Sequence, residues 1–360
     1  MNMSTKILDP RQLPQLQPAN LLWQHYRPEN APYRFQASTR AEAEAWQERT
    51  QRALEAAIGF QDLPPSPIAP QQIEVVDRGG YLREKWLMET TAGVSMPFYI
   101  LVPKQPKRPL PVVLAFNGHG YGVKDIVGLW EDGTERYTPD GYQKDFGVAL
   151  CQHGFLVAAP EISCFGERQT DFTALRNALP DTLVPSTCQH TAHLAFHLGG
   201  SVVGLRVFDA KRLLDYLQTR PDADCSRLGA MGISGGGLHT FYSACLDRRI
   251  RACVISGYYS TYRDSILAMD HCPCNFIPGL HQFGEMYDLV GLIAPRPLLV
   301  EAGSRDPIFP IESVKRSVEI ARSVYRVFGA EEQVETDFFE GRHSISGARA
   351  YDFLKEKLSA

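Results

Sequence analysis

Short apolar runs alternate with helical patterns from residue 71 to the end of the chain, and this alternation constrains the fold more than any other feature. Runs such as PVVLAFNG (111–118) and PLLVEAG (297–303) are continuously apolar, as expected of strands covered on both faces. The pattern predicts an α/β fold with a mostly parallel, twisted sheet of about eight strands and helices on both faces. The expected strands are 81–90, 97–103, 111–118, 155–161, 227–233, 250–257, 297–303 and 334–341, and the expected helices are 204–220, 237–247, 311–329 and a terminal helix over 347–360.

Residues 1–70 differ from the rest and are predicted to form a helical N-terminal extension that packs on a main domain over 71–360. Thr39 and Glu42 form a capping-box pattern at the start of a helix, and Gly59 suits the position after its end. The proline-rich stretch 63–70 reads as a linker. A second irregular stretch, about 162–203, separates two strands and is too long for a simple connection, so we expect a lid-like insertion.

The composition excludes several classes of partner. The net charge is −4 and the basic residues are scattered, which argues against nucleic acid as a partner. No run approaches the ~18 consecutive apolar residues of a membrane span, and the first residues lack the apolar core of a secretory signal. We therefore expect a cytoplasmic protein that binds neither nucleic acid nor membrane, and a homo-oligomer is compatible with the sequence.

The eight cysteines are expected to be reduced thiols in that compartment. Cys272 and Cys274 flank Pro273 beside His271 and invite comparison with a metal site. Zinc sites usually have two or more residues between paired cysteines and a second ligand pair, and the sequence displays neither. We expect no metal, no cofactor and no intrachain disulfide.

Residues 232–236, Gly-Ile-Ser-Gly-Gly, match the nucleophile elbow G-x-S-x-G. The motif follows an apolar run and precedes a helical pattern, which is the context that it requires. A serine at such a turn is lifted above the carboxyl edge of the sheet, where ligands bind in open α/β folds. Ser234 is the predicted nucleophile, and the backbone N–H of Gly235 is a predicted oxyanion donor.

A serine nucleophile needs a base and an orienting acid, and in this architecture the acid and then the base follow it along the chain. His343 alone lies on a loop after the last strand; His239 falls inside the helix after the elbow, and His271 and His281 lie in an irregular segment. For the acid we predict Asp306, on the loop after the strand 297–303. Glu301 lies inside that strand and is expected to face a helix layer, and Asp288 precedes the strand.

These motifs resemble the α/β-hydrolase superfamily, and more closely its dienelactone-hydrolase and acetyl-xylan-esterase-like branch. The likeness rests on residues 232–236, GSRDPIFP with Asp306, EGRHS with His343 and the FNGHG loop, and it covers about residues 75–358. The segment 271–310 also resembles a group of uncharacterised bacterial hydrolases of this branch. Setting AFNGH against the FHGY pattern of the branch implies that the main-chain N–H of His119 is the second oxyanion donor. Asn117 departs from that pattern, which often has His there.

The function expected from residues and resemblance together is hydrolysis of a small-molecule carboxylic ester, without cofactor or metal. Ser234 would attack the acyl carbon, His343 would transfer the proton and Asp306 would orient the imidazole. A peptidase or amidase and a carbon–carbon bond hydrolase would use the same triad. A non-catalytic binding protein that keeps the fold is the alternative from another class.

Overall fold

A nine-stranded sheet forms the centre of the computed structural model, which describes residues 9, 11–105 and 109–359. The strand order is β1-β2-β3-β5-β4-β6-β7-β8-β9; β4 to β9 run parallel, and β3, β2 and β1 continue the sheet in antiparallel pairs. The predicted α/β-hydrolase-like sheet is confirmed, with nine strands rather than about eight. The strands are β1 (Gln71–Asp77), β2 (Tyr81–Thr91), β3 (Val94–Pro103), β4 (Leu110–Phe116), β5 (Leu156–Pro160), β6 (Ala223–Ile233), β7 (Ala252–Ser256), β8 (Leu298–Gly303) and β9 (Val334–Phe339).

The additional strand is β1, at one edge of the sheet. Its sequence QQIEVVD contains no continuous apolar run, and almost all of it is exposed. It pairs with β2 alone, with a register irregularity between Gln72 and Glu74. An exposed edge strand buries little apolar surface, so it lacks the continuous apolar run that marks the central strands.

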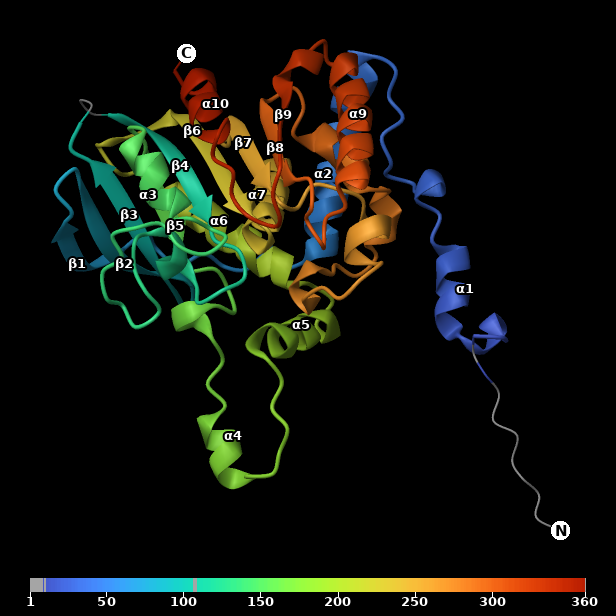
Figure 1. Cartoon of the computed structure of the whole chain (residues 1–360), viewed down its shortest axis with the longest axis horizontal. Helices are drawn as coiled ribbons and strands as arrows, with labels where there is room; N and C mark the ends of the chain where they lie inside the picture. Colours follow the sequence, from blue (N-terminus) through green and yellow to red (C-terminus); the bar gives the residue numbers. More distant parts are fainter. Residues whose placement is uncertain (1–8, 10, 106–108, 360) are drawn as a thin grey trace.

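Helices cover both faces of the sheet (Figure 1). On one face lie α3 (Phe146–Gln152) and α10 (Ala350–Lys357), and on the other lie α6 (Val202–Leu217), α7 (Gly235–Leu246), α8 (Met286–Leu289) and α9 (Ile311–Val327). Side chains of each strand alternate between the two layers: Val113 and Ala115 of β4 face α3, whereas Val112 and Leu114 face the other layer. The central strands are therefore buried on both sides, as their unbroken apolar sequences predicted.

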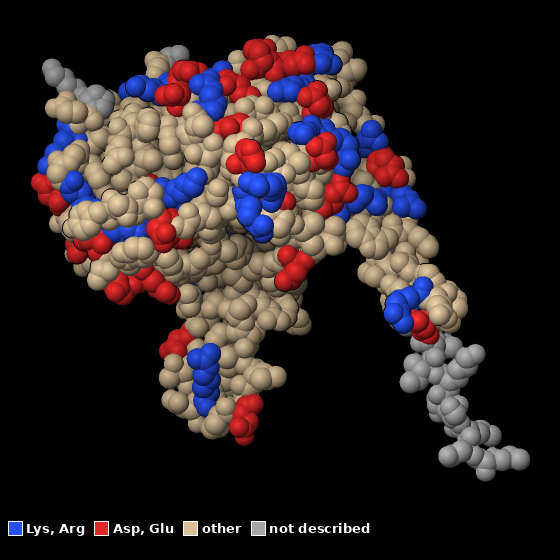
Figure 2. All heavy atoms as spheres, in the orientation of Figure 1, with Lys and Arg blue, Asp and Glu red and all other residues tan. Residues whose placement is uncertain are grey.

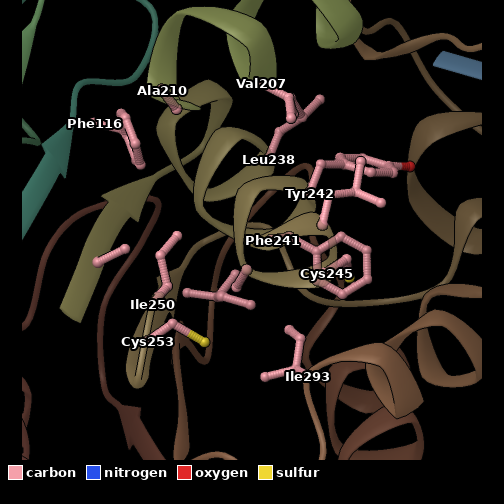
Figure 3. Close-up of a cluster of buried hydrophobic side chains, with 14 of the residues drawn as sticks. Phe116, Val207, Ala210, Leu238, Phe241, Tyr242, Cys245, Ile250, Cys253 and Ile293 are labelled. Carbon is pink, nitrogen blue, oxygen red and sulfur yellow. The ribbon is translucent and has the colours of Figure 1, made fainter. Parts of the chain in front are cut away.

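Helix α7 lies at the centre of the larger core. Figure 3 shows its side chains Leu238, Phe241 and Cys245 packed among residues of α6 and β7 and against Ile293. Every residue of α7 is buried. This packing fixes the helix directly behind the turn that carries Ser234.

The N-terminal extension contributes a long helix to the same core. Helix α2 (Arg40–Ile58) begins with the predicted capping box of Thr39 and Glu42 and ends at Gly59, whose φ is 72°. Trp46 and Leu54 are buried in the core cluster of the sheet, and Gln47 Nε2 donates to the carbonyl oxygens of Gly291 and Ala294, each at 2.6 Å. Helix α1 (Pro18–His25) has no buried residue and projects from the body in Figure 1.

The expected insertion at 162–203 consists of a projecting arm and a helix on the body. Helix α4 (Thr173–Ala178) lies at the tip of the arm and has no buried residue (Figure 1). Helix α5 (Thr187–His197) returns to the body and buries Cys188, Ala192 and Ala195. The insertion follows β5 directly, and its Phe165 packs against His119 of the loop after β4.

The surface carries no concentrated patch of one charge on the face shown in Figure 2, where acidic and basic side chains are interspersed. Among the residues that the structure describes, no helix has the length and apolar character needed to cross a membrane.

The packing of α2 predicts a large effect of truncating its central leucine. Leu54→Ala should lower the free energy of unfolding by about 2–5 kcal/mol, because it empties a fully buried site. Leu22→Ala in α1 is the control; this side chain is 69% exposed, and its loss should change the free energy by less than about 0.5 kcal/mol. Urea unfolding followed by circular dichroism measures both values. Similar small effects would contradict the inclusion of α2 in the cooperative core.

Candidate active site

Ser234 occupies a sharp turn between β6 and α7. Its backbone has φ 57° and ψ −121°, which is a strained conformation for a residue with a side chain. The Ser234 N–H donates to the carbonyl oxygen of Ser256 at 3.0 Å, and its own carbonyl accepts from Leu238 N–H at 2.9 Å. These bonds tie the turn to β7 on one side and to α7 on the other.

The glycines around Ser234 are required by close backbone approach. A Cβ atom on Gly236 would lie 1.8 Å from the carbonyl oxygen of Phe116, and one on Gly232 would lie 2.3 Å from that of Gly236. A Cβ on Gly237 would lie 2.8 Å from the Ser256 carbonyl oxygen. At Gly235 the nearest atoms belong to the side chain of His119, at 3.0 Å. Three of the four glycines therefore let α7 pack against β4, β6 and β7.

The structure brings the predicted base and acid together. His343 Nδ1 lies 2.6 Å from Asp306 Oδ2, while Asp306 Oδ1 accepts from the N–H groups of Ile308 and Phe309 at 2.9 and 3.2 Å. The Asp306 side chain is only 1% exposed. The other ring nitrogen of His343, Nε2, is buried and has no hydrogen-bond partner among the described residues. An imidazole that is oriented through Nδ1 and has an unpartnered Nε2 can accept a proton from a neighbouring hydroxyl.

Ser234 and His343 line the same cavity, which has a volume of about 290 Å³. The ring of His343 stacks between those of Tyr142 and Phe309, with centroid distances of 5.5 and 5.8 Å. The other residues that line the cavity are His119, Tyr142, Asp270, His271, Cys272, Asn275, Ile308 and Phe309.

The other histidines considered as the base lie elsewhere or have other contacts. His239 is buried behind the elbow, where Nε2 lies 2.7 Å from the carbonyl oxygen of Arg206, and burial lowers its pKa well below the usual value. His271 lines the cavity, and its Nε2 lies 3.2 Å from Ser265 Oγ. His281 is exposed.

The two alternative acids support neighbouring structure. Glu301 is fully buried and accepts hydrogen bonds from Ser256 Oγ at 2.6 Å and from the N–H groups of Ser346 and Gly347 at 2.9 and 2.8 Å. It therefore anchors the loop that carries His343. Asp288 accepts from Phe35 N–H at 3.1 Å, in the contact between the N-terminal extension and α8.

The N–H groups of His119 and Gly235 are available to a ligand. Within residues 11–105 and 109–359, neither group donates a hydrogen bond. The loop is fixed from other directions: Tyr142 Oη donates to the His119 carbonyl at 2.6 Å, Gln143 Oε1 accepts from Gly118 N–H at 2.6 Å, and Asn117 Nδ2 donates to the Gly118 carbonyl at 3.0 Å. Both N–H groups are therefore free to donate to an oxygen atom of a ligand.

Three supporting residues of this site escaped the sequence analysis. Two of them, Tyr142 and Gln143, lie in an irregular stretch that matches no motif. The hydroxyl of Tyr142 also interacts with that of Ser234. Glu161 follows β5; its carboxylate accepts from Val123 N–H at 2.9 Å and from Glu167 N–H at 3.4 Å. Burial raises the pKa of Glu161 to about 7. A carboxylate that ends an apolar strand run is the one signal that could have indicated Glu161.

One group of side chains beside the cavity could hold a metal ion. His119, Cys188, Cys272 and Cys274 each place a ligand atom within 4.8 Å of the others. The sequence lacked a second ligand pair for Cys272 and Cys274, and the fold supplies His119 and Cys188. His271, the neighbour considered from the sequence, is not in the group.

Comparisons with known proteins agree with this fold. The model of a family described as "Abhydrolase family" matches residues 19–352, so the match extends further toward the N-terminus than the expected 75–358. YtaP of Bacillus subtilis (strain 168), which is named as a hydrolase, is 27% identical over 277 residues, or 75% of this chain and 85% of YtaP. A solved structure from Bacteroides fragilis NCTC 9343, named as an acetyl xylan esterase, matches with a TM-score of 0.73 and 20% identity over 90% of this chain and 82% of that one. A glucuronoyl esterase from Solibacter usitatus matches with a TM-score of 0.63 and 16% identity over 86% and 91%.

The contacts of the elbow glycines predict that two neighbouring Gly→Ala changes differ sharply. Gly236→Ala should lower the free energy of unfolding by about 3 kcal/mol, because its Cβ would meet a backbone carbonyl that cannot move freely. Gly235→Ala is the matched control; it meets only a side chain and gains helix propensity, so its effect should stay within about 1 kcal/mol. Equal effects in urea unfolding would refute the close-approach explanation.

Proposed function

The chain belongs to the Abhydrolase family, and we propose that it is a serine hydrolase that cleaves carboxylic esters through an acyl-enzyme on Ser234. One observation carries the proposal. His343 is oriented by Asp306 through Nδ1, its buried Nε2 has no partner among the described residues, and its side chain lines the same cavity as Ser234. This is the arrangement that activates a hydroxyl nucleophile.

In the first half of the proposed reaction, Ser234 Oγ attacks the acyl carbon of the ester while its proton passes to His343 Nε2. The imidazolium that forms is stabilised by the buried carboxylate of Asp306. His343 then donates the proton to the leaving alkoxide oxygen, so the alcohol departs and the acyl group stays on Ser234.

The carbonyl oxygen of the substrate becomes negatively charged in each tetrahedral intermediate. The free N–H groups of Gly235 and His119 would donate to this oxygen. Gly235 is also the first residue of α7, so the positive end of the helix dipole lies at the same place.

In the second half, a water molecule replaces the alcohol. His343 takes a proton from the water, the resulting hydroxide attacks the acyl carbon, and the proton returns to Ser234 as the acid leaves. The cycle needs no metal or cofactor for bond cleavage.

The cavity of about 290 Å³ favours a small acyl or alcohol group next to Ser234. Two proteins of similar fold are named for esters of carbohydrates, so acetylated sugars and glucuronoyl esters belong in a substrate panel with simple aryl and alkyl esters. Amides and β-diketones belong in the same panel, because a peptidase, an amidase or a carbon–carbon bond hydrolase would use the same triad.

The nucleophile is tested by Ser234→Ala. The variant should lose about 10⁶-fold in kcat on the best ester while its urea unfolding stays unchanged, because only one hydroxyl is removed. It should also escape labelling by a fluorophosphonate that modifies the wild-type chain. Retention of more than a tenth of kcat would overturn the assignment, and absence of wild-type labelling together with absence of turnover would favour a binding protein.

The acid is tested by comparing two isosteric changes. Asp306→Asn should lower kcat by about 10⁴-fold, because the imidazole loses its orienting carboxylate. Glu301→Gln is the control, because one amide oxygen cannot accept all the hydrogen bonds that the Glu301 carboxylate accepts. The free energy of unfolding should fall by about 1–3 kcal/mol, and the loss in kcat should be smaller than in Asp306→Asn. The reverse ranking of the kcat losses would make Glu301 the catalytic acid.

A further inference from the structure

Three thiols and one imidazole from separate parts of the chain meet beside the candidate active site. His119 comes from the loop after β4, Cys188 from the first turn of α5, and Cys272 and Cys274 from the short 3₁₀ helix η6 (Pro273–Asn275) and the residue before it. Their ligand atoms lie within 4.8 Å of one another. We propose that this group, the Cys₃His cluster, is a binding site for one Zn²⁺ ion.

The separation of Cys274 and His119 in the Cys₃His cluster suits tetrahedral zinc. Zinc bonds of about 2.3 Å to sulfur and 2.0–2.1 Å to nitrogen, at a tetrahedral angle, place the two ligand atoms roughly 3.6 Å apart. Cys274 Sγ lies 3.6 Å from His119 Nε2. Three thiolates and one imidazole form one of the donor sets common in structural zinc sites.

The charge around the Cys₃His cluster also fits a bound dication. The guanidinium of Arg206 is fully buried, and its Nε and Nη1 atoms have no hydrogen-bond partner among the described residues. Arg206 forms no ion pair with a carboxylate of the described part of the chain. Its electrostatic partners are the thiols of Cys274, Cys164, Cys188 and Cys272, and all of these except Cys164 belong to the cluster. Three thiolates, one Zn²⁺ and the Arg206 cation sum to zero with a neutral His119, so a buried charge is compensated.

The cluster is accessible to an incoming ion. His119 and Cys272 line the catalytic cavity of about 290 Å³, and together with Cys188 they line a second cavity of about 490 Å³ under the insertion. The ion would enter through either cavity, and the three thiol protons would pass to solvent as the thiolates bind.

Four protein ligands leave no open position, so the proposed ion is structural rather than catalytic. It would join helix α5 of the insertion to η6 and to the loop that carries the His119 N–H. Ligation through Nε2 also places the remaining proton of His119 on Nδ1, on the side of the ring that faces Gly235. Zinc at this site would contradict the expectation from sequence that the chain binds no metal.

The test measures metal on the intact protein, independently of ester hydrolysis. After expression with zinc and exhaustive dialysis, elemental analysis of the wild type should find one zinc per chain. Exchange for cobalt should give the intense visible bands of a tetrahedral site and a near-ultraviolet charge-transfer band from thiolate. Cys188→Ser and Cys272→Ser should each lose the zinc and lower the melting temperature.

Cys225→Ser is the matched control, because Cys225 is also half-buried but lies in β6, outside the cluster. It should retain one zinc and the cobalt spectrum. The proposal would be overturned if the wild-type protein contained no zinc and showed eight titratable thiols after unfolding. Six or fewer titratable thiols would also overturn it, because that count would mean a disulfide. Full zinc in both Cys188→Ser and Cys272→Ser would also overturn it. If these variants fail to fold, the cobalt spectrum of the wild type decides alone.

Discussion

The strained backbone of Ser234 is the constraint on which the rest of the site depends. Holding a serine at φ 57° costs about 1–3 kcal/mol, and this cost must be offset by the surrounding structure. The offset comes from α7, which is buried along its whole length and approaches β4 so closely that Gly236 has no room for a Cβ atom. The central core therefore holds Ser234 at the cavity in an unfavourable backbone geometry.

The parallel sheet brings the other groups to that hydroxyl. Ser234 follows β6, Asp306 follows β8 and His343 follows β9, so all three leave the sheet at its carboxyl edge. Register alone would leave the long loop of His343 loosely placed. Glu301 of β8 removes this freedom, because it binds Ser256 of β7 together with two N–H groups just after His343. Glu301, which was considered as an alternative acid, thus positions His343 through the loop that it anchors.

The sequence predicted those parts of the fold and site that are encoded locally. The central strands have apolar runs, the elbow is contiguous, and the order of serine, acid and base is fixed along the chain. The edge strand β1 was missed because it buries almost nothing, and Tyr142 and Glu161 were missed because their roles arise from contacts across the fold. The cysteines show the same limit: Cys272 and Cys274 are separated by one residue, but Cys188 joins them only through the return of α5 to the body.

His119 connects the chemistry of the elbow with the insertion. Its carbonyl oxygen is held by Tyr142, its ring packs edge-on against Phe165 at 5.0 Å, and its Nε2 faces the thiol of Cys274. Its backbone N–H donates no hydrogen bond within the described residues. A donor that must be in position before charge develops benefits from such restraint, because reorganising it during the reaction would raise the barrier. With zinc on Nε2, the restraint would extend to α5, so the insertion would contribute to catalysis by holding a backbone donor rather than by contacting the reacting atoms.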